Sequence, residues 1–387
     1  MILQKSNRAG VYMNTLKGYK AFIPATLPPN PPILIDEEMQ HLLSDADRNL
    51  GRLDGITQII PNPELFVAMY VKKEAVLSSQ IEGTQASLVD VLNVPAENDL
   101  GFPHDQVAEV VNYVNAVYTG LGCLDEFPLS LRLIRKIHEI LLNGVRGANK
   151  NPGEFRTSQN WIGPPGCTLN TASFVPPAVD EMNRALSDLE MFMHAQDNIP
   201  PLIKIAIIHA QFETIHPFLD GNGRMGRLLI TFWLCQQQIL ERPLLYLSYY
   251  FKQYRSDYYD LLMGVRNDGD WESWIKFFLR GVSAVSCEAV LAAKKIFNLR
   301  ANLLNQASVF KSNENNARRL IEVIFEDPIV TKKQVAALLN VSDPTAGSLV
   351  NLFCKEGILM DLTPEKKRYK KYAFSDYLDI LGEGTEL

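Results

Sequence analysis

Paired cysteines and long apolar runs are both missing from this 387-residue chain. The five cysteines are scattered, odd in number and without a CxxC pair, which argues against a disulfide framework or a zinc site. No apolar run approaches the length of a membrane-spanning helix, and the first residues lack the apolar segment of a secretory signal. We therefore expect reduced thiols and a cytoplasmic protein with no membrane partner.

An excess of positive charge is also missing. The formal net charge is −6, so the chain as a whole has no general attraction to nucleic acid or to an anionic membrane. Hydrophobic residues make up 47% and charged residues 21%, which is ordinary for a globular protein. A chain of this length is expected to form about two or three domains. Function therefore has to be sought in local motifs.

One stretch, residues 216–227 with the sequence HPFLDGNGRMGR, separates two apolar segments with helical spacing. The upstream spacing predicts a helix that ends near Ile215, and Pro217 disfavours helix in the residue before it. The glycine-rich turn then opens a second helix at Asn222 or Gly223. Free backbone N–H groups and the positive end of the helix dipole make such a start an anion site, most naturally for phosphate.

Four side chains in this stretch carry chemistry. Arg224 and Arg227 lie within one turn of the helix start, where guanidinium groups clamp phosphate oxygens. Asp220 is a hard oxygen ligand suited to Mg²⁺, and His216 titrates in the range of a general base. Together they predict phosphoryl or nucleotidyl transfer to a hydroxyl. The alternative is an ordinary glycine-rich turn with a packed histidine and solvated arginines.

The stretch matches, at every position, the HxFx(D/E)GNGRxxR signature, so the chain resembles the Fic family, which transfers AMP from ATP to protein hydroxyls. The resemblance implies a mainly α fold, a helical core with a small β-hairpin flap, that uses ATP and Mg²⁺. It implies that His216 is the base, that Phe218 anchors the loop, that Asp220 binds Mg²⁺, and that the phosphates are held by Gly221, Asn222, Gly223, Arg224 and Arg227. The phosphorylating Doc-like branch has lysine where this chain has Gly223, so the pattern favours AMP transfer.

A second motif lies at the end of a helix predicted over residues 63–84, which Gly83 ends. Ser78 and Glu82 are four residues apart on one face, and spacing alone favours a solvated carboxylate there. However, SSQIEG resembles the (S/T)xxxE(G/N) inhibitory motif of Fic proteins. That resemblance implies that Glu82 pairs with Arg227 and blocks the productive pose of ATP. In some relatives this glutamate also serves AMP removal, which the sequence does not decide.

The same resemblance applies to two further segments. Residues 153–177 are rich in glycine and proline and predict a short β-hairpin, the flap that pairs with an extended target backbone. An ordinary surface loop is the alternative. The strand expected nearest the nucleotide consists of Asn160, Trp161, Ile162 and Gly163. Tyr258 and Tyr259 resemble a pair that stacks near adenine, although core packing is the commoner role. His138 and His209, on predicted helices, are expected to be structural.

The C-terminal pattern differs from the rest. Helices are predicted at 271–281 and 283–308, followed by a polar linker at 311–318. The remainder gives three helices and two strands around a charged tip and resembles a winged helix-turn-helix. The tip supplies cations suited to phosphate, namely Lys366, Lys367, Arg368, Lys370 and Lys371. The predicted recognition helix has no Arg, Lys or Gln to reach base edges, so protein interaction or homodimerisation competes with DNA binding.

We therefore expect three parts: residues 1–128 with the inhibitory motif (78–83), 129–308 with the catalytic core, and 316–387 with the winged helix. A proline-rich segment, 20–33, is expected to lie extended along the surface. The first function hypothesis is an autoinhibited protein adenylyltransferase acting on a Tyr, Ser or Thr hydroxyl of a protein, itself included. The second is a nucleotide-sensing, DNA-binding transcriptional regulator. The intact His216 favours the enzyme, and the complete GNGR sequence argues against transfer of another group.

Overall fold

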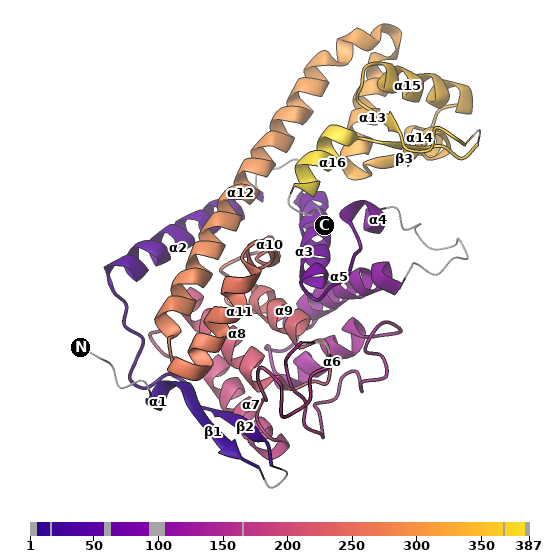
Figure 1. Ribbon diagram of the computed structural model, residues 1–387. Helices are drawn as coiled ribbons and strands as arrows, with labels where there is room; N and C mark the ends of the chain where they lie inside the picture. Colours follow the sequence, from indigo (N-terminus) through magenta and orange to yellow (C-terminus); the bar gives the residue numbers. More distant parts are fainter. Residues whose placement is uncertain are drawn as a thin grey trace.

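The computed structural model describes residues 6–15, 18–57, 63–92, 105–164, 166–366 and 368–383. Its fold is mainly helical, as the sequence predicts, with two small antiparallel sheets (Figure 1). The helices are α1 (Ser6–Ala9), α2 (Glu37–Thr57), α3 (Pro63–Ile81), α4 (Leu88–Leu92), α5 (Asp105–Leu124), α6 (Leu131–Leu141), α7 (Val179–His194), α8 (Pro201–Ile215), α9 (Asn222–Gln236), α10 (Ser248–Gln253), α11 (Arg255–Asp268), α12 (Trp271–Gln306), α13 (Glu314–Glu326), α14 (Lys332–Leu339), α15 (Asp343–Lys355) and α16 (Ser375–Gly382). The strands are β1 (Gly10–Asn14), β2 (Lys20–Pro24), β3 (Ile329–Thr331), β4 (Met360–Asp361) and β5 (Lys371–Ala373). None of the helices described has both the length and the apolar character needed to cross a membrane.

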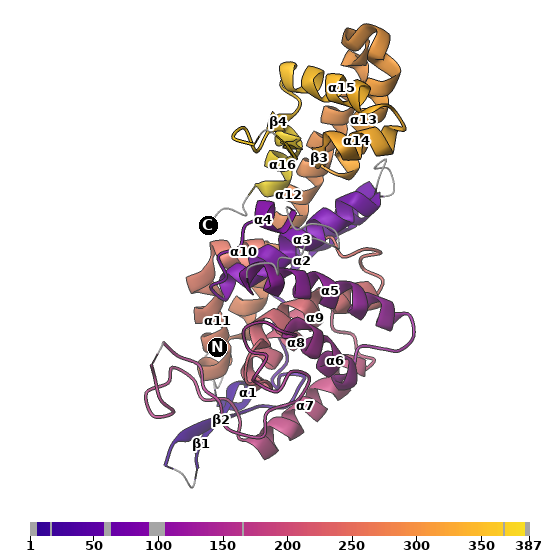
Figure 2. The same cartoon turned by 90° about the vertical axis from the view of Figure 1, so that its right-hand side faces the viewer.

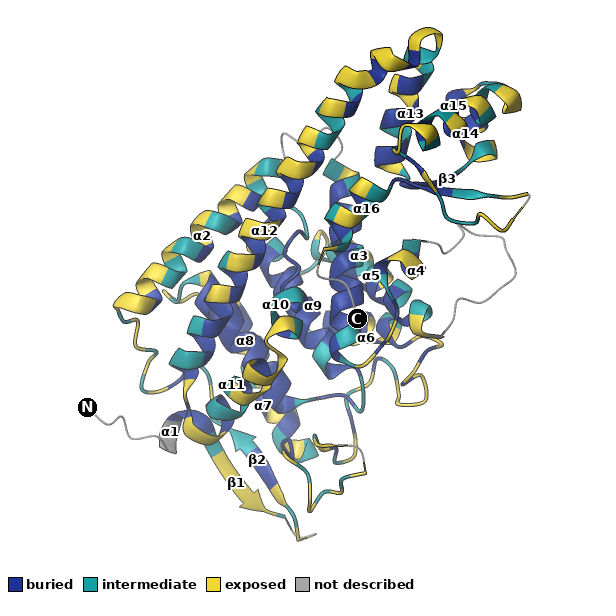
Figure 3. Cartoon of the chain, turned by 45° about the horizontal axis from the view of Figure 1, so that its top comes forward, coloured by how far each residue is buried: buried dark blue, intermediate teal, exposed yellow. Residues whose placement is uncertain are grey.

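The part of the molecule outside the C-terminal elements α13 to α16, called the body below, has its core around α8. This helix is apolar on nearly all sides, and every residue from Leu202 to Ile215 is buried. A helix of this kind has to be enclosed by others. It packs against α7, α9, α11 and α12, while α9 in turn contacts α3, α5 and α6 (Figures 1 and 3). The two helices that flank the glycine-rich turn are therefore enclosed by other helices of the described chain.

Helix α12 is a single element that runs from the body to the C-terminal unit, α13 to α16 with β3 to β5 (Figures 1 and 2). The prediction of two helices, 271–281 and 283–308, was wrong. Gly281 lies inside the helix, and a Cβ there would meet Tyr250 Cδ1 at 2.7 Å. The glycine therefore serves close packing against α10 and does not end the helix.

The C-terminal unit contains the three predicted helices and the two predicted strands after them, and it adds β3 and α16, which the sequence did not predict. Its sheet has the order β3-β5-β4, and Thr331 caps α14 with a reciprocal bond to Gln334. The predicted linker at 311–318 was wrong, because a 3₁₀ turn fills Ala307–Asn313 and α13 starts at Glu314. Phe310, whose ring centroid is 4.8 Å from that of Phe353, fixes this segment to the unit. The winged-helix assignment and the limits of the three parts stay predictions.

The N-terminal hairpin was not foreseen. Residues 20–33 were expected to be extended along the surface, but β2 pairs with β1 from Gly10↔Pro24 to Asn14↔Lys20. Phe22 N–H donates to Val175 O at 2.9 Å, so the hairpin lies against the end of the predicted flap. The alternation of β1 is weak because its residues from Val11 to Asn14 are exposed. That weakness explains why periodicity did not reveal the hairpin.

Two glycines of α5 provide a test of its packing on α9. A Cβ on Gly120 would lie 2.2 Å from Phe232 Cζ, whereas one on Gly122 would meet nothing within 4 Å. We expect Gly120→Ala to lower the free energy of unfolding by about 1–3 kcal/mol through overpacking. Gly122→Ala on the same helix should raise it by about 0.5–1 kcal/mol through helix propensity. Denaturant unfolding of both variants would measure this, and equal shifts would contradict the contact.

Candidate active site

The glycine-rich turn is held in one shape by its own side chains. Helix α8 ends at Ile215, and His216 adopts a left-handed backbone with φ of 49°. Phe218 is buried, and its N–H donates to Asn222 Oδ1 at 2.8 Å while Asn222 Nδ2 donates to Phe218 O at 2.8 Å. Gly221, with φ of 76°, then opens α9. Asn222 therefore shapes the turn, and the backbone N–H groups at the start of α9 are left for an anion.

His138 of α6 holds this turn through a hydrogen bond to Asp220 and ring stacking on Phe218. Gly153 N–H donates to its Nδ1 at 2.9 Å, so the proton sits on Nε2, which donates to Asp220 O at 2.9 Å. Its ring stacks on Phe218 with centroids 3.6 Å apart. Burial lowers the pKa of His138 to about 4, which keeps the ring neutral. The expected structural role is confirmed, but nothing in the sequence linked this histidine to the motif.

The predicted flap proved to be a loop with one bridge. Among its described residues, only Ile162 and Phe174 pair, because Gly163, Pro164 and the prolines before α7 interrupt any longer ladder. Trp161 is exposed, as the edge of a flap would be. The hairpin prediction was therefore wrong in extent, and binding of a target backbone at this edge stays a prediction.

Asn160 has a different role from the one expected of a flap strand. It is buried, and its Nδ2 donates to Phe218 O at 2.8 Å and to His216 O at 3.1 Å. Arg156, also buried, donates from Nε to His216 O at 3.1 Å. Both side chains fix the backbone on which His216 is carried. Arg156 was missed by the sequence reasoning, because an arginine that bonds only to carbonyls leaves no pattern in the sequence.

His216 is poised as a neutral base. Its Nδ1 is fully covered and has no hydrogen-bond partner among the described residues. Burial, followed by the positive charges of Arg266 and Arg156, lowers the pKa of His216 to about 3. A histidine whose pKa lies below its ordinary value stays unprotonated throughout the neutral range. It is therefore available to accept a proton without first losing one.

This lowered pKa gives a prediction about titration. The ring signal that disappears in His216→Ala should show no inflection in an NMR titration from pH 8 to about pH 5, because protonation is shifted below that range. The same shift makes stability depend on pH. The unfolded chain takes up this proton near pH 6.5 and the folded chain does not, so acidification lowers the free energy of unfolding. An inflection close to pH 6.5 would contradict the enclosed environment of His216.

Arg224 is a buried cation with unused donors. Its side chain is 1% exposed, and Nε and Nη1 have no hydrogen-bond partner among the described residues. The closest carboxylates are 3.7 Å away in Glu109 and 3.8 Å away in Asp220, too far for hydrogen bonds. Buried donors without partners are costly and rare. Their position in the first turn of α9 is where a bound anion would satisfy them.

Arg227 is already occupied. Its Nη2 lies 2.8 Å from Glu82 Oε1, its Nε donates to Ser78 Oγ at 2.8 Å, and Nη2 also donates to Ser78 O at 2.9 Å. The predicted pairing of Glu82 with Arg227 is thus present. Burial acts to raise the pKa of Glu82, but Arg227 beside it outweighs burial and lowers it. The pair therefore persists at neutral pH and is lost only when acidification protonates Glu82.

Gly223 shows where the Glu82 carboxylate lies. A Cβ at Gly223 would be 2.3 Å from Glu82 Oε1 and 3.1 Å from Arg227 Nη1. The carboxylate thus rests directly against the first turn of α9, where the sequence predicts an anion. A carboxylate in that place competes with phosphate for the same guanidinium and the same helix start.

Glu109 of α5 lies at the candidate site, which the sequence did not reveal. It is buried, and its Oε2 accepts from Thr84 Oγ1 at 2.7 Å and from Arg146 Nη2 at 3.4 Å. The same oxygen lies 3.7 Å from Arg224 Nη1. Glu109 therefore connects Thr84, in the turn after residues 78–83, with Arg224. Its helix is separated from both in the sequence, so spacing gave no signal.

Asp220 is the side chain available to a metal ion. Its Oδ1 accepts from Gly221 N–H at 2.6 Å, and its side chain is 35% exposed. Across the described residues, no group of three or more His, Cys, Asp and Glu forms a self-contained metal site. One accessible carboxylate beside a phosphate site suits Mg²⁺, which commonly takes one or two carboxylates together with phosphate oxygens and water. The residues present thus fit this ion.

The tyrosine pair divides into two roles. Tyr258 is 1% exposed, its OH lies 2.9 Å from His209 Nε2, and its ring centroid is 4.5 Å from that of Phe251. The expectation that Tyr258 stacks on adenine was wrong, because both faces of its ring are in the core. His209 is packed, as expected. Tyr259 is 39% exposed, and its place beside a base stays a prediction.

Comparison with known families agrees with this geometry. Residues 40–122 match the Fic/DOC family N-terminal region, and residues 128–234 match the Fic/DOC family. The second match contains the whole glycine-rich turn, all of α8 and α9 up to residue 234. The chain belongs to the Fic/DOC family.

Relatives of this Fic/DOC family member include proteins named protein adenylyltransferase Fic. One from Aedes aegypti is 30% identical over 169 residues, which is 43% of this chain and 30% of the relative. Another from Culex quinquefasciatus is 29% identical over 169 residues, covering 43% and 29%. The match thus spans less than a third of each relative.

A solved structure extends the likeness of fold. A Fic family protein from Desulfovibrio desulfuricans G20 is 21% identical, with a TM-score of 0.57 that covers 89% of this chain and 97% of that one. At this identity the likeness concerns the fold alone.

Proposed function

We propose that this protein transfers AMP from ATP to a Tyr, Ser or Thr hydroxyl of a protein, with this chain itself as one candidate, and that Glu82 restrains the reaction. The observation that carries the proposal is Arg224, a buried guanidinium with unpaired donors in the first turn of α9. The neutral His216 stands at the other end of the same turn. Relatives named protein adenylyltransferase support the reaction class at the level of the family.

The residues would divide the reaction as follows. His216 accepts the proton of the target hydroxyl as its oxygen attacks the α-phosphorus. The bond between the α-phosphorus and the bridging oxygen breaks, pyrophosphate leaves, and AMP stays on the target as an ester. The N–H groups at the start of α9 and the free donors of Arg224 hold phosphate oxygens and stabilise the charge that develops on them. Asp220 would hold Mg²⁺, which neutralises phosphate charge when bound.

We expect Glu82 to restrain the reaction because its carboxylate occupies the guanidinium group of Arg227. Arg227 donates from Nη2 to Glu82 and from Nε to Ser78, so its guanidinium group is not free to bind the γ-phosphate. ATP can still reach the start of α9 with its phosphates displaced from the productive position. We therefore expect a weak basal reaction in the wild type and a strong one when the carboxylate is removed.

The test measures which labelled phosphate of ATP is incorporated into protein. The purified protein is incubated with Mg²⁺ and ATP carrying the label at the α- or the γ-phosphate, with and without a cell extract as a source of targets. Incorporation of the α-label alone supports AMP transfer. Incorporation of the γ-label would replace the proposal with phosphorylation, and absence of both labels despite ATP binding would favour a nucleotide-sensing regulator.

A further inference from the structure

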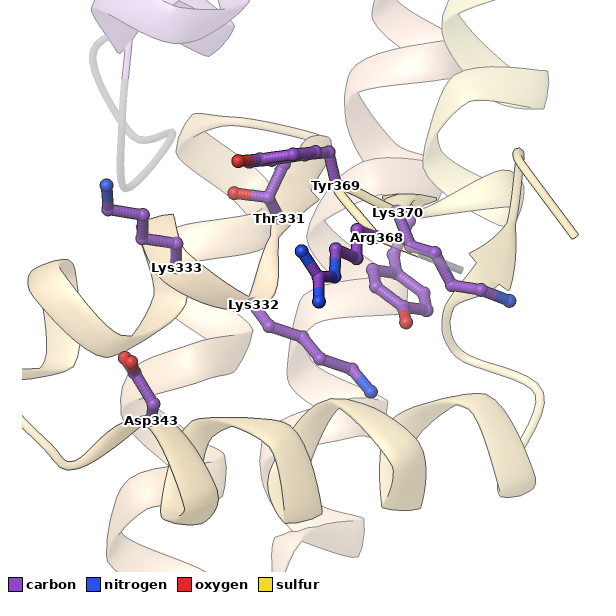
Figure 4. A pocket seen from close by; sticks show the side chains of 8 residues that line it. Thr331, Lys332, Lys333, Asp343, Arg368, Tyr369 and Lys370 are labelled. Atoms are coloured by element: carbon purple, nitrogen blue, oxygen red, sulfur yellow. The ribbon is translucent and has the colours of Figure 1, made fainter. Parts of the chain in front are cut away.

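The C-terminal unit carries a hollow that the proposed reaction does not use. It has a volume of about 420 Å³ and lies between the start of α14, the start of α15 and the wing, which we define as residues 360–373 from β4 to β5. Lys332 and Lys333 border it from α14, Arg368 and Tyr369 from the wing, and Asp343 from α15 (Figure 4). The unit stands at the far end of α12 from the active site (Figure 1).

Three of the cations at this hollow are not neutralised. Lys333 and Arg368 form no ion pair with another described residue, and Figure 4 shows Arg368 reaching from the wing into the space above Lys332. Lys332 Nζ donates to the neutral Asn351 Oδ1 at 2.8 Å and lies 5.4 Å from the centroid of the Tyr372 ring. Lys370, by contrast, is paired with Asp361. A hollow with several free cations attracts an anionic group.

The charge is also segregated along the chain. Residues 331–372 contain eight Lys and Arg against four Asp and Glu, so they carry +4 while the remaining residues carry −10. Lys367 belongs to that count but lies outside the described residues. A basic segment in an otherwise acidic chain indicates a local partner with negative charge. The net charge of the whole chain had concealed this feature.

The surroundings of the hollow favour the backbone of a nucleic acid duplex. Helices α14 and α15 are joined by a tight turn at Asn340, whose φ of 52° is left-handed, and the wing stands beside them. Tyr369 in the wing is 88% exposed, so its ring is accessible to a partner bound at the hollow. The exposed residues of α15 are Asp343, Pro344, Ser348, Asn351 and Lys355. Ser348 and Asn351, in the middle of the helix, give no bidentate contact to guanine, and the basic Lys355 is its last residue.

We propose that this hollow binds the phosphate backbone of duplex nucleic acid, with little preference for sequence. Lys332, Lys333 and Arg368 would each contact phosphate, and Tyr369 would lie against the sugar–phosphate edge. Three such contacts give a slope of log K against log salt of about −2.7. The affinity should then fall roughly 40-fold between 50 and 200 mM salt. Binding of this kind is independent of ATP and of the motif at 216–227.

The experiment is fluorescence anisotropy of the full-length protein with a labelled duplex of about 20 base pairs, in two unrelated sequences, over a salt series. Lys333→Glu combined with Arg368→Glu removes two contacts without disturbing a hydrogen bond of the described chain. We expect at least a tenfold loss of affinity and a salt slope that is less steep by about 2. Arg319→Glu, at an exposed position of α13 that does not border the hollow, makes a charge change of the same kind and should leave affinity within about twofold.

Three outcomes would overturn the proposal. Arg319→Glu changes the charge by −2 and the double variant by −4, so a loss in Arg319→Glu about half as large on a logarithmic scale would mean that only net charge matters. An affinity that does not change with salt would exclude phosphate contacts. Binding of poly-glutamate but not of duplex would assign the hollow to an acidic protein. Because the two substituted residues lie far from His216, label incorporation should be unchanged in the double variant, which separates this result from the proposed reaction.

Discussion

Glu82→Gly should raise incorporation of α-labelled AMP into protein by at least tenfold. The substitution removes the carboxylate that lies 2.8 Å from Arg227 and rests against Gly223, so the guanidinium and the start of α9 become free for phosphate. Each factor of ten corresponds to about 1.4 kcal/mol of competition, which is comparable to the net contribution of about 1.5–3 kcal/mol from a hydrogen bond to a charged group. Initial rates at saturating ATP and Mg²⁺ would measure the effect.

The matched control lies at the start of α3, the helix that Glu82 directly follows. Glu64→Gly, in the exposed first turn of α3, also replaces a paired glutamate with glycine, but its partner is Arg242 on the surface. It should leave the rate at the wild-type level. Glu82→Gln, which keeps the shape but removes the charge, should give an intermediate rate. No increase in Glu82→Gly, with ATP binding intact, would show that the pair does not restrain the reaction.

His216→Ala, introduced into Glu82→Gly, should lower incorporation by about 10² to 10⁴, the usual contribution of a general base. ATP affinity should change little, because the phosphates are assigned to Arg224, Arg227 and the helix start. Alanine keeps the backbone bond from residue 216 to Phe212 O, so the turn should remain formed. Isothermal titration with ATP alongside label incorporation would separate binding from chemistry.

His194→Ala is the comparison for this loss, because His194 is an exposed histidine at the end of α7. Its incorporation rate should equal that of the parent. Retention of the full rate in His216→Ala would remove this histidine from the proposed mechanism. A parallel loss of ATP affinity would instead mean that the histidine supports the phosphate site.

The sequence predicted those parts of the site that are contiguous. The helix that ends at Ile215 and the one that starts at Asn222 follow from apolar spacing and a glycine-rich turn, whereas the buried anchor Phe218 was implied by the family resemblance. The pairing of Glu82 with Arg227 was also predicted, although 145 residues separate them. That prediction depended on a family motif, since spacing alone favoured a solvated carboxylate.

The parts that were missed depend on tertiary contacts. Tyr258 is enclosed by Phe251 and His209, and no local pattern distinguishes an enclosed tyrosine from one that faces a ligand. Asn160 was placed on a flap strand, but carbonyl groups far along the chain draw its amide into the turn. Gly281 was taken as a helix end because propensity does not include the space that Tyr250 needs. In each case packing decided what local preference left open.

The burial of α3 has a consequence for how the proposed restraint by Glu82 is released. Thirteen of its nineteen residues are buried, and Lys73 Nζ donates to Glu383 O beyond the end of α16. Exposing the apolar residues of this helix would cost on the order of 10 kcal/mol or more. The carboxylate of Glu82, in contrast, is 31% exposed at the end of the helix. We therefore expect that release of the proposed Glu82 restraint needs a change of rotamer at that one side chain, while α3 stays in place.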